Sequence, residues 1–171
     1  LASEETEPLP VTLYGASKWC QTLAALAYRH HGLKVSCARV FNVLGPGMPE
    51  NLSLGSFAKQ IVSIERGLQE PRILVGNLTP RRDYVDVRDV SRALADLGKK
   101  GEPGEIYNVA SGKAPSMREL LEGLIGHAGR PISIVEDPSR MRAVDVKVCA
   151  GSHAKITRVL GWRPQFSLDR S

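Results

Sequence analysis

Segments with helical character alternate with short segments of strand character along this chain. Such alternation favours an α/β architecture. At 171 residues the chain suits one domain and can bury a hydrophobic core. Helices are expected near residues 14–30, 56–66, 89–98, 116–128 and 152–160, and strands near 34–41, 72–75, 83–87, 105–110 and 132–136.

Turn and capping residues mark the ends of several of these segments. Gly32 and Gly161 follow the first and last helices, and glycine commonly ends a helix because it adopts left-handed backbone angles at little steric cost. Ser56 is expected to cap the second helix, and Ser116 with Glu119 forms a capping box. The residues that follow the first strand, 42–47, are expected to form a loop.

The helix at residues 14–30 is rich in small residues and apolar on more than one face. Trp19, Leu23, Leu26 and Tyr28 together give it more than one apolar face, so the helix is expected to pack on two sides. One side would face a sheet. The other would face a partner subunit, which predicts a homodimer formed through this helix.

Lys18 lies four positions after Tyr14 at the start of this helix. Positions i and i+4 share one face, so the phenol and the ammonium point to one place. A phenol exchanges protons poorly at neutral pH, but a nearby positive charge favours the phenolate. The pair is therefore a candidate proton-transfer device, although the spacing alone also occurs in ordinary surface helices.

Composition argues against several other kinds of protein. The net charge is +5, yet the basic residues are scattered and aromatic residues make up only 5%, which argues against nucleic-acid binding. No apolar run approaches the length of a membrane span. The histidines, including the adjacent His30 and His31, lack metal-ligand spacing, so no metal is expected.

The cysteines and two of the carboxylates have simple structural interpretations. Cys20, Cys37 and Cys149 are odd in number and lie among apolar residues, so they are expected to be buried free thiols in a cytoplasmic protein. Asp86 and Asp89 flank the start of a helix, and we expect them to cap it rather than to take part in catalysis.

Five motifs occur in an order that resembles the C-terminal half of the extended short-chain dehydrogenase/reductase family, also known as the NAD-dependent epimerase/dehydratase family. The motifs are YGASK at 14–18, RVFNVLGP at 39–46, RDYVDVRD at 82–89, YNVASG at 107–112 and GWRP at 161–164. The resemblance covers essentially the whole chain. SFAKQI at 56–61 and GNL at 76–78 are most similar to GDP-4-keto-6-deoxy-D-mannose reductases and GDP-mannose 4,6-dehydratases.

The resemblance implies an α/β fold: the last part of a Rossmann-type parallel sheet plus a small α/β lobe for the substrate. Residues 1–47 would complete the dinucleotide-binding domain, and residues 48–171 would form mainly the sugar-nucleotide lobe. The glycine-rich loop and the Ser or Thr that the family carries upstream of the tyrosine are not among these residues. The chain is therefore expected to be a fragment, inactive alone, of an NAD- or NADP-dependent enzyme.

The resemblance also implies roles for individual residues. Tyr14 would be the general acid or base, and Lys18 would favour its phenolate and hydrogen-bond the nicotinamide ribose. Phe41 would lie beside the nicotinamide, or else serve only as a core aromatic residue. Asn42 would contact the sugar nucleotide, or else cap a loop.

The remaining implied contacts are to the nucleotide-diphosphate sugar. Arg82 has a guanidinium that suits diphosphate oxygens, whereas Arg81 is expected at the surface. The other substrate-binding residues implied by the resemblance are Asn51, Leu52, Asn77, Arg142 and Asp145.

The favoured activity is reduction of GDP-4-keto-6-deoxy-mannose with Tyr14 as proton donor. Epimerisation and 4,6-dehydration use the same tyrosine and lysine, so these residues leave the reaction type open. A non-catalytic nucleotide-sugar-binding module is the alternative from a different class, if the protein begins at Leu1.

Overall fold

The computed structural model describes residues 1–141 and 146–171. The chain forms two compact units, and it passes between them more than once. The first unit comprises residues 1–44, 83–113 and 149–171, and the second comprises residues 45–82 and 114–148.

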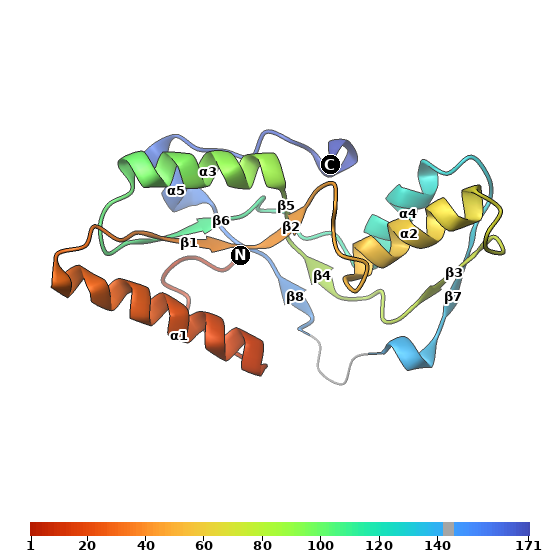
Figure 1. Cartoon of the computed structure of the whole chain (residues 1–171), viewed down its shortest axis with the longest axis horizontal. Helices are drawn as coiled ribbons and strands as arrows, with labels where there is room; N and C mark the ends of the chain where they lie inside the picture. Colours follow the sequence, from red (N-terminus) through yellow and green to blue (C-terminus); the bar gives the residue numbers. More distant parts are fainter. Residues whose placement is uncertain (142–145) are drawn as a thin grey trace. The chain divides into compact units, whose positions relative to one another are not determined.

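The first unit is built on two pairs of parallel strands. β1 (Cys37–Val40) pairs with β6 (Ile106–Val109), and β2 (Asn42–Leu44) pairs with β5 (Tyr84–Asp86). In Figure 1, α1 (Leu13–Ala27) lies on one side of β1 and β6, and α3 (Val87–Lys100) and α5 (Ala154–Leu160) lie on the other. This layered, parallel arrangement is the predicted α/β class.

The core of the first unit lies on the side of α3 and α5. It is formed by apolar residues of β5, β6 and these two helices together with Trp162. The Trp162 indole N–H donates a hydrogen bond of 3.1 Å to the carbonyl of Asp89, so its polar atom is satisfied in the core. The core members are Val85, Val90, Ala93, Leu97, Tyr107, Val109, Ile156 and Trp162.

Helix ends in this unit follow the capping chemistry expected from the sequence. Thr12 caps α1 by accepting a hydrogen bond from the N–H of Gly15. A short 3-10 helix, η1 (Tyr28–His31), continues α1 and ends at Gly32 with φ +82°. Gly161 closes α5 in the same conformation, with φ +71°. A last 3-10 turn, η3, spans Leu168–Arg170.

The second unit packs two helices on another parallel pair. α2 (Ser53–Glu65) and α4 (Met117–Gly126) are close to each other, and β3 (Arg72–Val75) pairs with β7 (Ser133–Glu136). The predicted capping box at Ser116 and Glu119 opens α4. A 3-10 turn, η2, spans Pro138–Arg140, and β4 (Arg81–Arg82) pairs with β8 (Val148–Cys149).

Several predicted details differ from the structure. α2 begins at Ser53, so Ser56 lies inside the helix and does not cap it. Residues 42–44 continue as β2 instead of forming a loop, because their backbone finds a partner in β5. β1 is half-buried rather than buried, since its one hydrogen-bonded neighbour in the described chain is β6.

The two units do not follow one another along the chain. The first segment of the first unit ends at residue 44. The pairing of β5 with β2 and of β6 with β1 then brings residues 83–113 back into the first unit. These long-range strand pairings leave no local sequence signal.

Candidate active site

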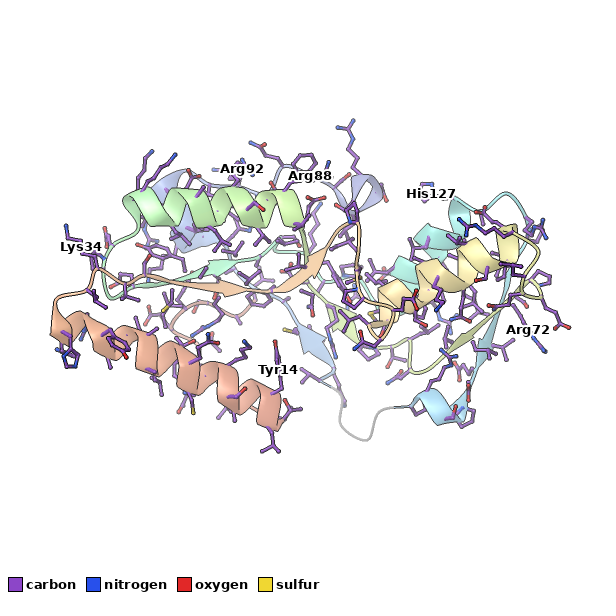
Figure 2. The ribbon with its side chains drawn as sticks, in the orientation of Figure 1. Tyr14, Lys34, Arg72, Arg88, Arg92 and His127 are labelled. Carbon is purple, nitrogen blue, oxygen red and sulfur yellow. The ribbon has the colours of Figure 1, made fainter. Side chains whose placement is uncertain are left out.

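Tyr14 and Lys18 lie on one face of α1, as the four-residue spacing predicted. The Lys18 Nζ atom is 5.7 Å from the centroid of the Tyr14 ring. Tyr14 is 72% exposed and sits on the first turn of the helix, where Figure 2 labels it. The Lys18 ammonium also donates a hydrogen bond of 3.2 Å to Gln21 Oε1. An exposed phenol next to a fixed cation can give a proton to a bound molecule.

Phe41 and Asn42 follow the carboxyl end of β1, beside the carboxyl end of the parallel strand β6. Ligands of open α/β sheets bind at such strand ends. Phe41 is half-buried, and its N–H donates to the carbonyl of Val109 at 3.0 Å. The Asn42 side-chain Nδ2 donates to the carbonyl of Asp83 at 2.9 Å, so this amide is held inside the first unit.

The other predicted substrate residues that the structure describes lie in the second unit. Asn51 and Leu52 are exposed just before α2. The Asn77 Oδ1 atom accepts hydrogen bonds from the N–H and the hydroxyl of Thr79, at 3.0 and 2.8 Å. That arrangement is an Asx turn, which holds the loop after β3 by itself.

The Arg82 side chain donates hydrogen bonds to two backbone carbonyls. Its Nη1 atom donates to the carbonyls of Arg81 at 2.9 Å and Val146 at 2.5 Å. Arg81 is exposed, as expected, and forms an ion pair with Glu119 at 3.4 Å. The predicted residues Arg142 and Asp145 lie outside the described part of the chain.

The structure therefore divides the predicted site residues between its units. The proton-transfer pair, Phe41 and Asn42 belong to the first unit. The predicted substrate residues 51, 52, 77 and 82 belong to the second.

Of the two carboxylates near the start of α3, Asp86 caps the helix as predicted, whereas Asp89 lies inside its first turn and does not cap it. Asp86 caps the helix by accepting from the N–H of Arg88 at 2.7 Å. The Arg88 side chain, which donates two further hydrogen bonds to it, holds the pKa of the Asp86 carboxyl well below its usual range. Asp89 accepts from the backbone N–H groups of Gln165 and Phe166. It therefore fastens the C-terminal segment to α3.

The expectation that all three cysteines are buried is wrong. Cys20 is exposed because it lies on α1, which contributes no buried residue in this chain. Cys37 and Cys149 are half-buried, and burial raises the pKa of the Cys37 thiol. Among residues 1–141 and 146–171, no group of His, Cys, Asp or Glu side chains could hold a metal ion.

Asp83, a carboxylate of the first unit, was not predicted as a functional residue. It is fully buried, and its oxygens accept from Ser111, Gly112 and Gly151. The available signal was its place between Arg82 and a buried strand, where a carboxylate needs several hydrogen-bond donors.

The whole chain, residues 1–171, matches the family model described as GDP-mannose 4,6 dehydratase. It is 38% identical to a GDP-6-deoxy-D-mannose reductase from Pseudomonas aeruginosa, over 98% of this chain and 56% of that protein. It is 30% identical to a dTDP-L-rhamnose 4-epimerase from Burkholderia thailandensis, over 98% of this chain and 46% of that protein.

Almost the whole chain also aligns with solved structures. The structure of RMD from Pseudomonas aeruginosa, complexed with NADPH, aligns with a TM-score of 0.90 at 37% identity, covering 98% of this chain and 56% of that one. A putative epimerase from Burkholderia cenocepacia aligns with a TM-score of 0.85 at 34% identity, covering 99% and 54%. The chain thus spans about half the length of the relatives it matches. No helix within the described residues is long and apolar enough to cross a membrane.

Proposed function

Because the chain belongs to the GDP-mannose 4,6-dehydratase family, we propose that it supplies the proton-transfer residues and the sugar-nucleotide lobe of an NAD(P)-dependent enzyme. The favoured reaction is reduction of GDP-4-keto-6-deoxy-mannose. The single observation that carries this proposal is the exposed Tyr14–Lys18 pair on one face of α1.

The residues present fit a nicotinamide cofactor. Tyr14 and Lys18 offer exposed hydrogen-bonding groups on one helix face, and Phe41 offers an aromatic ring at the carboxyl end of β1. Tyr14, Lys18 and Phe41 would hold the nicotinamide end. The similarity to a structure complexed with NADPH supports NADP as the cofactor, with NAD as the alternative. When bound, the reduced nicotinamide supplies a hydride to the keto carbon of the sugar.

Tyr14 donates its phenolic proton to the ketone oxygen as that oxygen gains negative charge. The Lys18 ammonium stabilises the phenolate that remains, because opposite charges attract at short distance. The keto group thereby becomes an alcohol, with its carbon receiving the hydride and its oxygen the proton. Asn42 in the first unit, together with Asn51, Leu52, Asn77, Arg82, Arg142 and Asp145, would bind the sugar nucleotide.

The boundaries of the two functional parts remain part of this proposal. We assign residues 1–47 to the end of the dinucleotide-binding domain, because β1 and α1 lie there. We assign the sugar-nucleotide lobe, expected mainly at 48–171, to residues 48–82 and 114–148, which belong to the second unit. Cys20 and Cys37, which form no disulfide, support a cytoplasmic location.

The experiment is an assay of the full protein with GDP-4-keto-6-deoxy-mannose and NADPH, followed by the loss of NADPH absorbance. Stoichiometric NADPH oxidation with formation of a GDP-deoxyhexose supports the reductase. The similarity to a 4-epimerase favours a second candidate, epimerisation, which would convert a nucleotide sugar without net oxidation of NADPH. Binding of the sugar nucleotide without any turnover would favour a non-catalytic binding module.

A further inference from the structure

Asp83 connects several segments of the first unit. Its side chain is fully buried, and no step of the proposed reaction uses it. One carboxylate oxygen accepts from the N–H and the hydroxyl of Ser111, at 2.8 and 2.6 Å. The other accepts from the N–H groups of Gly112 at 3.0 Å and Gly151 at 3.1 Å. One side chain thus ties the turn after β6 to the turn after β8.

The backbone of Asp83 reaches a third segment. Its carbonyl accepts from both the N–H and the side-chain Nδ2 of Asn42, at 3.1 and 2.9 Å. Its own N–H donates to the carbonyl of Cys149 at 2.8 Å. Because this one carbonyl accepts both hydrogen bonds, the side-chain amide of Asn42 is held in one orientation at the start of β2.

Gly151 connects the same carboxylate to Phe41. A Cβ atom at Gly151 would lie 2.4 Å from two carbons of the Phe41 ring, so the glycine backbone is packed directly against that ring. The Gly151 N–H donates to the Asp83 carboxylate. Asp83 therefore also positions the Gly151 backbone that packs against the Phe41 ring.

We propose that Asp83 is a positioning residue for the cofactor and the sugar nucleotide. Its carboxylate holds Gly151 against the Phe41 ring, and its carbonyl orients the Asn42 amide, so both contact groups are fixed before ligands bind. This inference rests on the proposed function, which places the nicotinamide beside Phe41 and the sugar nucleotide beside Asn42.

The informative variant is Asp83→Asn, which keeps the shape but replaces one acceptor oxygen with an NH2 group that faces N–H donors. The matched control is Asp89→Asn. Asp89 is also fully buried and also accepts two backbone N–H bonds, at 2.8 and 3.0 Å, but these come from Gln165 and Phe166, and its other oxygen accepts from the Arg92 guanidinium at 2.5 Å. Each variant leaves buried donors unpaired, so both should lose stability.

The full protein is assayed at matched folded fraction. For Asp83→Asn we expect the KM for the sugar nucleotide to rise about tenfold, because displaced contact groups weaken ligand binding. We expect kcat to fall by less than about threefold, because the carboxylate does not contact Tyr14 or Lys18. Asp89→Asn should leave both constants within about twofold of the wild type. Equal KM values in the two variants would mean that Asp83 is only a structural residue.

A measurement without turnover separates this inference from the proposed function. Hydrogen exchange of backbone amides should accelerate at 41–44, 111–112 and 151 in Asp83→Asn, and at 165–166 in Asp89→Asn. Unchanged exchange at 41–44 would overturn the positioning role even in an active enzyme. A wild-type protein without NADPH oxidation would instead overturn the reductase proposal.

If Asp83→Asn does not fold, Ser111→Ala is the second variant. It removes one of the four hydrogen bonds to the Asp83 carboxylate and should also raise the KM for the sugar nucleotide.

Discussion

At the scale of single residues, the chemistry proposed for this protein depends on a pair that is local in sequence. Tyr14 and Lys18 meet because a helix places positions i and i+4 on one face, and the structure confirms that geometry. Asp83 is the opposite case. Its partners lie 28 to 68 positions away, so no local spacing could indicate that one carboxylate joins them.

The first prediction concerns Tyr14→Phe, which removes the proton donor and keeps the ring. We expect kcat to fall about 100- to 10,000-fold, the usual range for the loss of a general acid. The unfolding midpoint should not change, because the side chain is 72% exposed. Tyr28→Phe is the control, since Tyr28 is also exposed and begins the turn that continues α1. Steady-state kinetics would contradict the role of Tyr14 if both variants kept full activity.

The second prediction concerns pH and Asp86. Its carboxyl is ionised more readily in the folded state than in the unfolded chain, because Arg88 hydrogen-bonds the charged form. The resulting stabilisation is complete above the unfolded pKa of about 4 and is lost as the pH falls toward the lower folded value. Asp86→Asn should therefore reduce the free energy of unfolding at neutral pH and flatten its decline below about pH 5.

Urea denaturation between neutral and acidic pH measures this effect. Asp169→Asn is the control, since Asp169 is an exposed carboxylate in η3, near the C-terminal end of the chain. An identical pH dependence of the unfolding free energy in wild type and Asp86→Asn would contradict the assignment.

At the scale of elements, the types of most helices and strands followed from sequence pattern, whereas some boundaries did not. α2 begins at Ser53, before the expected cap at Ser56; its N-cap residue is Leu52, which makes no side-chain capping hydrogen bond, so no capping signal marks that start. β2 replaced an expected loop because a three-residue strand becomes stable only through its pairing with β5.

The third prediction concerns Gln60, whose side chain pairs with the backbone of Leu74 on β3. Its Oε1 atom accepts from the Leu74 N–H at 2.9 Å, and its Nε2 atom donates to the Leu74 carbonyl at 3.2 Å. Gln60→Leu removes both bonds and should reduce the free energy of unfolding by about 1–3 kcal/mol.

Chemical denaturation measures this loss, with Lys59→Leu as the control on the adjacent, exposed position of α2. The Lys59 side chain forms an exposed ion pair with Glu50, and such pairs contribute about 0–1 kcal/mol. Equal stability losses in the two variants would show that the Gln60 pairing adds nothing specific to β3.

At the scale of the whole molecule, we predict a homodimer formed through α1. The helix contributes no buried residue within this chain, although Leu13 and Leu23 are 92% and 50% exposed. Apolar side chains left uncovered along one helix are typical of protein interfaces. Leu23→Lys should therefore shift the full protein from dimer to monomer in light scattering.

The control is Leu68→Lys, at an apolar residue that is 77% exposed and follows α2 in the second unit. It should leave the molecular mass unchanged. A wild-type protein that is monomeric at micromolar concentration, or a Leu23→Lys variant that remains dimeric, would contradict an interface through α1.

The sequence by itself determined the α/β class, most of the element types, the glycine ends of η1 and α5, and the shared face of Tyr14 and Lys18. These features depend on periodicity and on contacts within a few residues. Tertiary structure alone decided that residues 83–113 and 149–171 return to the first unit, and that Asp83 joins Asn42, Gly112 and Gly151. Strand pairing and buried hydrogen bonds between distant residues form only when the chain folds, and they leave no periodic pattern in the sequence.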